Sequence, residues 1–182
     1  MSIRAAVDSM REIVGDIGAK IIFVNAGLRD YFDNPPEYNW APCVSVDRQT
    51  LLFYEVEKLI GIDGAIGIWR RIGYRGIQYA HEIGGLLRPF EEFTPKEKYL
   101  KGAEVFALAT GKGRVVQNGN GVDFDGYDCV MCEPYRVGRS ICSVYTGILQ
   151  YVADWAYGKD VQCVTETRCR AKGDDTCYYQ LE

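Results

Sequence analysis

The hydrophobic pattern of this 182-residue chain changes its period once, near Gly113. Before this glycine, apolar residues recur every three or four positions, as they do in amphipathic helices. After it, short apolar segments and tight turns indicate strands, with one further helical segment between them. Helices followed by two hairpins with a helix between them are typical of an α+β domain. We therefore expect N-terminal helices packed on a four-stranded antiparallel sheet.

The predicted helices rest on apolar stripes and on residues that begin or end them. Asp47 is a suitable N-cap, and Thr94-Pro95-Lys96-Glu97 is a capping box with proline at the first helical position. Two prolines in Asp33-Asn-Pro-Pro indicate an extended loop over residues 30–39. This loop is the strongest internal boundary, so we expect a helical extension over residues 1–40 and one domain over residues 41–182. Helices are expected at residues 3–16, 19–28, 49–61, 63–83, 95–111 and 140–157.

The predicted strands form two hairpins, each with a glycine at its turn. Asn118-Gly-Asn-Gly is a strong signal for the first turn, and Lys172-Gly-Asp-Asp marks the second. Strands are expected at residues 114–117 and 121–132, and at residues 160–169 and 174–181.

The composition fits a folded domain that shows no signal for nucleic-acid binding or membrane insertion. Apolar residues make up 47% of the chain and aromatic residues 13%, which is too apolar for a disordered protein. The net charge of −4 argues against a nucleic-acid binder, and no apolar stretch approaches the roughly twenty residues of a membrane span. No secretion signal is recognisable, so we expect a cytoplasmic protein whose seven cysteines are ligands or buried side chains.

Cysteines and a glutamate surround the turn of the second hairpin. Cys169 and Cys177 are each four residues from Gly173, so a symmetric hairpin sets them opposite each other. Opposed residues have Cβ atoms about 4.5–5.5 Å apart, close enough for both sulfurs to bind one ion. Cys142 begins the preceding helix and Glu166 supplies an oxygen, which completes a tetrahedral zinc set.

The period of the strand places a condition on this set. Successive side chains alternate between faces, so Glu166 and Cys169 share a face only if a bulge interrupts the strand at Thr167–Arg168. In a straight strand, Cys163 becomes the better third ligand because it shares a face with Cys169. The alternative without a metal is a cross-strand thiol pair, or a disulfide, between Cys169 and Cys177.

Cys129-Val-Met-Cys132 is a second cysteine motif, on or just after a predicted strand. A CxxC pair is either half of a metal site or a redox pair. No βαβ pattern or helix N-terminus accompanies it, which disfavours thioredoxin-like chemistry. We treat Cys129 and Cys132 as a second thiol site, for another metal, an iron–sulfur cluster across a dimer, or no metal, and we favour no metal.

The C-terminal motif resembles the V4R (4-vinyl reductase) domain over about forty residues. That pattern has a Cys before a glycine-containing helix, then Glu-x-x-Cys, Gly-Asp, and a Cys followed by an aromatic residue. Such domains occur in phenol-sensing activators, bacteriochlorophyll-related proteins and archaeal hydrocarbon-binding proteins, and share a fold with small subunits of the vesicle-tethering transport particle. The CxxC motif lies outside the pattern. The resemblance implies that a structural Zn²⁺ is bound by Cys142, Glu166, Cys169 and Cys177.

The resemblance also implies a cavity for a small apolar or aromatic molecule. His81 is the only histidine of the chain, and the phenol sensors of this family use a histidine for the ligand hydroxyl. A lone histidine beside apolar residues is more often part of the core, and so are aromatic residues at helical spacing. The candidate ligand-binding residues are Trp69, Tyr74, His81, Phe106, Tyr127, Tyr135 and Tyr145.

The sequence thus predicts a zinc-stabilised domain that binds or senses a small molecule and acts through a protein partner. It also predicts a homodimer, formed through the glycine-rich helix of residues 63–84. The alternatives are a tetrapyrrole vinyl reductase or its accessory subunit, and a scaffold like the transport-particle subunits. The sequence contains no glycine-rich dinucleotide loop and no pair of histidines, so an enzyme is the less favoured class.

Overall fold

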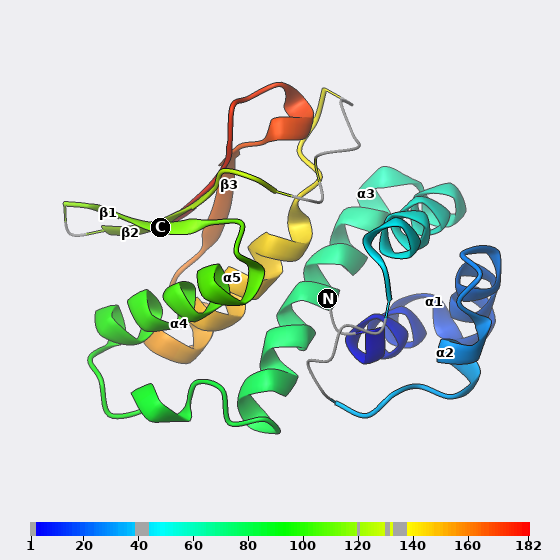
Figure 1. Cartoon of the computed structure of the whole chain (residues 1–182), viewed down its shortest axis with the longest axis horizontal. Helices are drawn as coiled ribbons and strands as arrows, with labels where there is room; N and C mark the ends of the chain where they lie inside the picture. The colour runs from blue at the N-terminus through cyan, green and yellow to red at the C-terminus, as the bar shows by residue number, and fades with distance from the viewer. Residues whose placement is uncertain (1–2, 39–43, 120, 130–131, 133–137) are drawn as a thin grey trace. The chain divides into compact units, whose positions relative to one another are not determined.

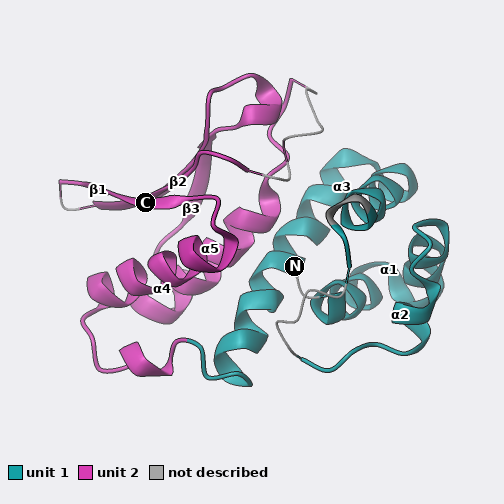
Figure 2. Ribbon diagram, in the orientation of Figure 1, with its two compact units in different colours: residues 1–86 teal, residues 87–182 magenta. Residues whose placement is uncertain are grey.

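The chain forms two compact units in the computed structural model, which describes residues 3–38, 44–119, 121–129, 132 and 138–182 (Figure 1). Figure 2 colours the N-terminal unit, residues 1–86, and the C-terminal unit, residues 87–182. The sequence analysis instead placed a boundary after residue 40. The helices on either side of that point pack against each other inside the N-terminal unit, so the units divide further along the chain.

The described helices of the N-terminal unit are α1 (Ile3–Asn25), α2 (Arg29–Asp33) and α3 (Val46–Glu82). Glycines with positive φ interrupt the two long helices, Gly15 at 72° and Gly61 at 74°. Side chains other than glycine rarely adopt this conformation, so each glycine breaks the helix near a predicted boundary between two shorter ones. Helix α2 corrects the loop predicted over residues 30–39, because the prolines prevent helix only from residue 35 onward.

Helix α1 packs on α3, with polar contacts along one side of the pair. Glu12 of α1 pairs with Arg75 and, at 3.1 Å, with Arg71 of α3. The hydroxyl of Tyr79 donates a hydrogen bond to Asp8 at 2.9 Å. The interior between the helices is apolar and includes the buried side chains of Ala5, Met10, Phe23, Leu52, Ile68 and Ile72.

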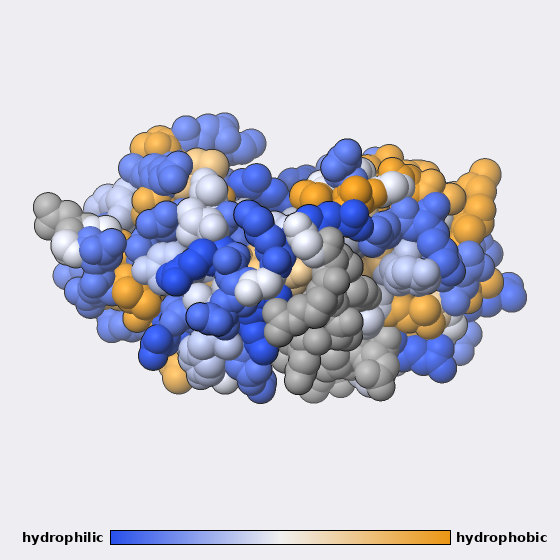
Figure 3. All heavy atoms as spheres, turned by 90° about the horizontal axis from the view of Figure 1, so that it is seen from above, coloured by the Kyte–Doolittle hydropathy of each residue, from blue (hydrophilic) through white to orange (hydrophobic). Residues whose placement is uncertain are grey.

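The surface of the N-terminal unit exposes several large apolar side chains, and Figure 3 shows hydrophobic patches among hydrophilic surface. A cavity of about 250 Å³ lies between α1 and α3, lined by Ile21, Ile22, Asn25, Glu55, Lys58 and Leu59. The predicted dimer surface is the later part of α3, whereas the exposed apolar residues include Ile13, Ile17, Ile21 and Val24 of α1 and Tyr54 and Leu59 of α3. The homodimer stays a prediction.

The C-terminal unit contains a sheet of four antiparallel strands in the order β1-β2-β4-β3. Helices α4 and α5 pack on each other and on this sheet. The predicted α+β class, with a helix between two hairpins, is confirmed. The elements are η1 (Arg88–Phe90), α4 (Pro95–Thr110), β1 (Arg114–Asn118), β2 (Gly121–Gly126), α5 (Ser143–Tyr157), β3 (Val164–Arg168), η2 (Arg170–Lys172) and β4 (Cys177–Leu181).

Helix α4 begins and packs as its sequence dictates. The hydroxyl of Thr94 accepts a hydrogen bond from the N–H of Glu97, and the Glu97 carboxylate accepts one from the N–H of Thr94, which forms the predicted capping box. Further along, a Cβ on Gly102 would collide with Val152 of α5, so this glycine permits the close contact between the two helices. Among the helices described, none combines the length and apolar character that a bilayer crossing requires.

Candidate metal centre

A bulge in β3 sets the geometry of the site. Glu166 and Arg168 pair with neighbouring residues of β4, so Thr167 is an extra residue in the strand. The bulge that the sequence analysis required at Thr167–Arg168 is therefore present. It removes the strict alternation that would set Glu166 and Cys169 on opposite faces.

The chain then turns through η2 and returns as β4. The backbone N–H of Cys169 donates a hydrogen bond to the Asp174 carboxylate at 2.7 Å, which fixes the entry to the turn. Gly173 ends η2 with a φ of 116°, in the region that glycine favours. The return places Cys177 at the start of β4, paired with Gly126 of β2.

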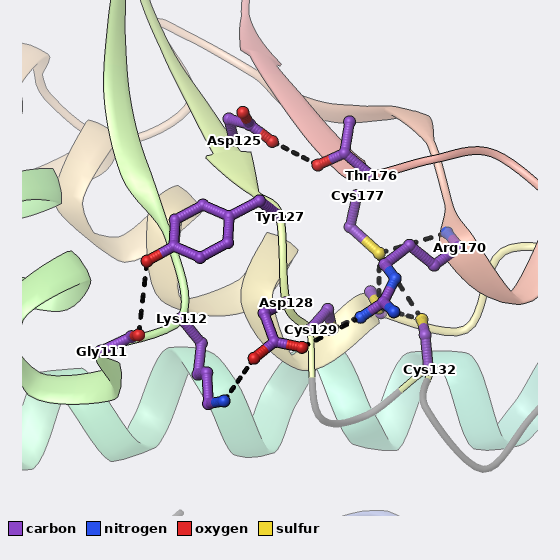
Figure 4. A network of polar contacts seen from close by, with 11 residues as sticks. Gly111, Lys112, Asp125, Tyr127, Asp128, Cys129, Cys132, Arg170, Thr176 and Cys177 are labelled. Carbon is purple, nitrogen blue, oxygen red and sulfur yellow. Dashed lines mark hydrogen bonds and ion pairs between the residues drawn. The ribbon is translucent and has the colours of Figure 1, made fainter.

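Buried thiols gather at this end of the sheet, and Figure 4 shows part of the group beside Arg170 and Asp128. The sulfur of Cys142 lies 2.7 Å from that of Cys132, 3.1 Å from that of Cys129 and 3.5 Å from that of Cys177. The Cys132 sulfur lies 3.5 Å from that of Cys169 and 3.6 Å from that of Cys177. All five are free thiols, so the predicted alternative of a disulfide between Cys169 and Cys177 is absent.

The ligand atoms form two four-membered sets, within each of which all atoms lie within 4.8 Å of one another. Either set is arranged to hold a metal ion. One set matches the zinc ligands implied by the sequence, and the structure brings these residues together. The other includes the CxxC motif, which the sequence analysis treated as a separate site. The sets are Cys142, Glu166, Cys169 and Cys177, and Cys129, Cys132, Cys142 and Cys177.

Two structural reasons explain why the CxxC motif joins the cluster. Strand β2 ends at Gly126, so Cys129 and Cys132 follow the strand instead of lying within it as predicted. The N–H of Cys132 donates to the carbonyl of Cys129 at 3.1 Å, which closes a tight turn between them. Because β2 pairs with β4, that turn lies beside the start of β4 and Cys177.

Glu166 supplies the oxygen ligand of the cluster. Its Oε1 is buried and has no hydrogen-bond partner among the described residues. Burial raises the pKa of Glu166 to about 10, and the neighbouring Cys169 thiolate contributes to the shift. A buried polar atom without a partner costs free energy, and a cation bound here would remove that cost. The side chain therefore fits a metal ligand.

Crowding separates the thiols by their ease of ionisation. Hydrogen bonds from Cys132 and Cys142 lower the pKa of Cys169 to about 5. Hydrogen bonds from neighbouring thiols, that of Cys129 first, hold the pKa of Cys177 far below its usual value. The same contacts raise the pKa of Cys142 well above its usual range. The group thus keeps protons that a divalent cation would displace.

Backbone N–H groups stabilise the two thiolates. The N–H of Arg170 donates to the sulfur of Cys177 at 3.3 Å. The backbone of Ile141 hydrogen-bonds to Cys169 and contributes to lowering its pKa. Hydrogen bonds to the ionised form favour it, so these two cysteines have the thiolate character that metal ligation needs.

Ion pairs hold the loop before the CxxC motif next to η2. Asp128 pairs with Lys112 and accepts a hydrogen bond from Arg170 at 3.4 Å (Figure 4). The hydrogen bond from Lys112 keeps the pKa of Asp128 below its usual value. Thr176, next to Cys177, hydrogen-bonds to Asp125 of β2. These contacts surround the cluster and orient the segments that carry its ligands.

The candidate ligand-binding residues lie in both units. Phe106 stacks on Phe124 with ring centroids 5.0 Å apart and meets Tyr145 edge-on at 4.9 Å, so both candidates are core residues of the C-terminal unit. Tyr127 is exposed. Trp69, Tyr74 and His81 lie on α3 in the N-terminal unit, and none of these six residues lines the cavity described there. Tyr135 lies outside the described residues.

The fold is shared with solved structures of H-NOX proteins at low sequence identity. A structure described as "Probing the function of heme distortion in the H-NOX family" matches with a TM-score of 0.66 and 13% identity, covering 100% of this chain and 93% of that chain. A mutant of the T. tengcongensis H-NOX gives 0.64 and 14%, covering 100% and 95%. An H-NOX protein from S. oneidensis in the Fe(II)NO ligation state gives 0.62 and 12%, covering 98% and 97%. These matches show the α+β fold alone.

The sequence family is V4R over the C-terminal third of the chain. The V4R domain model matches residues 122–182, the segment that contains every ligand of the cluster, which confirms the resemblance found in the sequence. No curated protein matches the chain.

Proposed function

We propose that this protein is a metal-stabilised domain that binds and senses a small apolar or aromatic molecule. The observation that carries the proposal is the buried group of thiols with Glu166, inside the segment matched by the V4R domain. Thiolate ligands suit Zn²⁺, and four protein ligands leave no position for a catalytic water. The metal's proposed role is structural: it ties the β3–β4 turn to the start of α5.

Helix α5 links the metal centre to an aromatic cluster in the same unit. Cys142 is its N-cap residue, and Tyr145 follows within the first turn. The Tyr145 ring lies 4.9 Å from Phe106 and 6.1 Å from Tyr179. The hydroxyl of Tyr179 is buried without a hydrogen-bond partner among the described residues. A small aromatic ligand with one polar group would supply that partner, and binding beside α5 would be transmitted by a shift of this helix.

The output of such a domain is proposed to pass through a protein partner in the cytoplasm. A homodimer through the helix of residues 63–84 is part of the proposal. The net charge of −4 gives no support for a nucleic-acid partner.

Heme, which is named in connection with one of the similar H-NOX structures, does not fit the described residues. Heme iron is held by His, Cys, Met or Tyr side chains. The chain has one histidine, His81, which lies on α3, and the described buried thiols contact one another in the cluster. A tetrapyrrole vinyl reductase is also less supported, since the sequence lacks a dinucleotide loop.

Native mass spectrometry of the full chain as purified tests the metal part of the proposal. The wild type is expected to retain Zn²⁺, and the Cys177→Ser variant is expected to lose it. Cys163→Ser is the matched control, because Cys163 is exposed and outside both ligand sets. Equal metal content in wild type and Cys177→Ser would refute the assignment.

Thermal shift with two simple probes, phenol and toluene, tests the ligand part. Both are expected to raise the melting temperature, and Tyr179→Phe is expected to remove the extra effect of phenol. Tyr127→Phe, at an exposed tyrosine, is the control. The ligand proposal fails if neither probe changes the melting temperature, or if Tyr179→Phe leaves the difference between the probes intact.

A further inference from the structure

We infer that the cluster binds two metal ions that share Cys142 and Cys177 as bridging thiolates. This inference deepens the proposed metal site and rests on it. The two four-membered ligand sets overlap in these two cysteines, and each set has two members of its own. The terminal ligands are Cys129 and Cys132 on one ion, and Glu166 and Cys169 on the other.

The number of ligands supports two ions. Two tetrahedral ions that share two bridging ligands need six ligands in total, and the two sets together contain six residues. A single tetrahedral ion would use four of them. The remaining two, either the CxxC pair or Glu166 with Cys169, would then stay buried beside the ion without a cation of their own.

The separations of the sulfurs agree with shared ions. Two sulfurs on one tetrahedral Zn²⁺, each at about 2.3 Å from the metal, lie about 3.8 Å apart. The bridging sulfurs of Cys142 and Cys177 are 3.5 Å apart, and that of Cys132 is 3.6 Å from Cys177. The Cys132 and Cys169 sulfurs, at 3.5 Å, belong to different ions in this arrangement and must move apart as the ions bind.

The charge of the ligands points the same way. Five thiolates and one carboxylate carry six negative charges when all are ionised. One divalent ion compensates two of these charges, and two ions compensate four. The backbone hydrogen bonds from Arg170 to Cys177 and from Ile141 to Cys169 stabilise part of the remainder. Two ions are therefore the smaller electrostatic cost for a buried site.

The position of the CxxC motif does not depend on the metal alone. Asp128 precedes Cys129 and is held by Lys112 and by Arg170 of η2. Strand β2 delivers this segment to the site through its pairing with β4. The second pair of terminal ligands is thus held beside Cys142 and Cys177 by the fold.

Metal counting on the full chain tests the inference. The protein is stripped of metal, reconstituted with Zn²⁺ and analysed by native mass spectrometry. Two ions are expected in the wild type and in the Cys163→Ser control, and one ion in the variant with both Cys129→Ser and Cys132→Ser. One ion in the wild type overturns the shared centre but leaves the proposed zinc-stabilised domain standing, whereas no ion overturns both.

Cadmium NMR of the wild type provides a test that needs no variant. Two cadmium resonances are expected, with the β protons of Cys142 and Cys177 coupled to both metals and those of the other cysteines coupled to one. A single resonance, or two resonances with no shared cysteine, contradicts the bridged centre. Iron with acid-labile sulfide in protein as purified also overturns it, since sulfide would replace the bridging thiolates.

Discussion

The two units of this chain keep their polar groups in different places. In the N-terminal unit, the ion pairs of Glu12 with Arg71 and Arg75 lie at the surface, and the interior between α1 and α3 is apolar. In the C-terminal unit, ionisable thiols and Glu166 are buried together at one end of the sheet. Buried charge is stable only when it is compensated. The first unit is therefore expected to depend on packing, and the second on a cation as well.

The largest expected effect comes from removing a shared ligand. Cys177→Ser is expected to lower the free energy of unfolding of the C-terminal unit by about 3–5 kcal/mol, the range for breaking a buried charge pair. Urea denaturation of metal-loaded protein measures it, with Cys163→Ser as the control. A loss below that of the control, or none, would show that the thiols are ordinary core residues.

Packing in the C-terminal unit is tested at Gly102. Gly102→Val introduces a side chain that collides with Val152, and overpacking of this kind costs about 1–3 kcal/mol. The metal content is expected to stay unchanged, since Gly102 lies on α4 and outside the ligand sets. Denaturation and metal analysis on the same sample separate the two sources of stability. Loss of metal in this variant would argue against that separation.

The N-terminal unit is expected to gain stability from a helix substitution. Nothing lies within 4 Å of a Cβ placed on Gly67, and this residue is inside α3. Gly67→Ala is therefore expected to raise the melting temperature, by the equivalent of about 0.5–1 kcal/mol. Gly61→Ala is the contrasting variant, because its φ of 74° strains any other residue and the change is expected to destabilise. The same sign for both variants would contradict this reasoning.

The smallest effect is expected at the surface ion pairs. The hydrogen bond from Arg75 holds the pKa of Glu12 below its usual value. The resulting stability is complete above the unfolded-state pKa of about 4.3 and is lost as the pH falls through the lower folded-state pKa. Because Glu12 is exposed, Glu12→Gln is expected to cost less than about 1 kcal/mol at neutral pH, and less in high salt. A larger, salt-independent cost would mean that the pairs are not solvent-screened.

Local signals in the sequence were sufficient for much of the fold. The capping box at Thr94, the helix breaks near Gly15 and Gly61, and the bulge at Thr167–Arg168 each depend on a few adjacent residues. Short-range stereochemistry decides such features, so they are readable without tertiary information.

The composition of the metal centre depends on contacts that the sequence does not specify locally. The sequence separated Cys129 and Cys132 from the zinc ligands because their approach requires β2 to pair with β4, strands about fifty residues apart. Nothing in a CxxC motif encodes that strand order. The aromatic candidates illustrate the same limit: helical periodicity marks Phe106 as inward-facing but does not distinguish a core from a pocket.

Hydrogen exchange of the full chain, with and without metal, tests the contrast between the units most directly. With Zn²⁺ bound, amides in β3, β4 and the first turn of α5 are expected to exchange much more slowly than after metal removal, while those of α1 and α3 exchange at the same rate in both states. If metal removal leaves exchange in β3, β4 and α5 unchanged, the cluster does not stabilise the C-terminal unit through a bound ion.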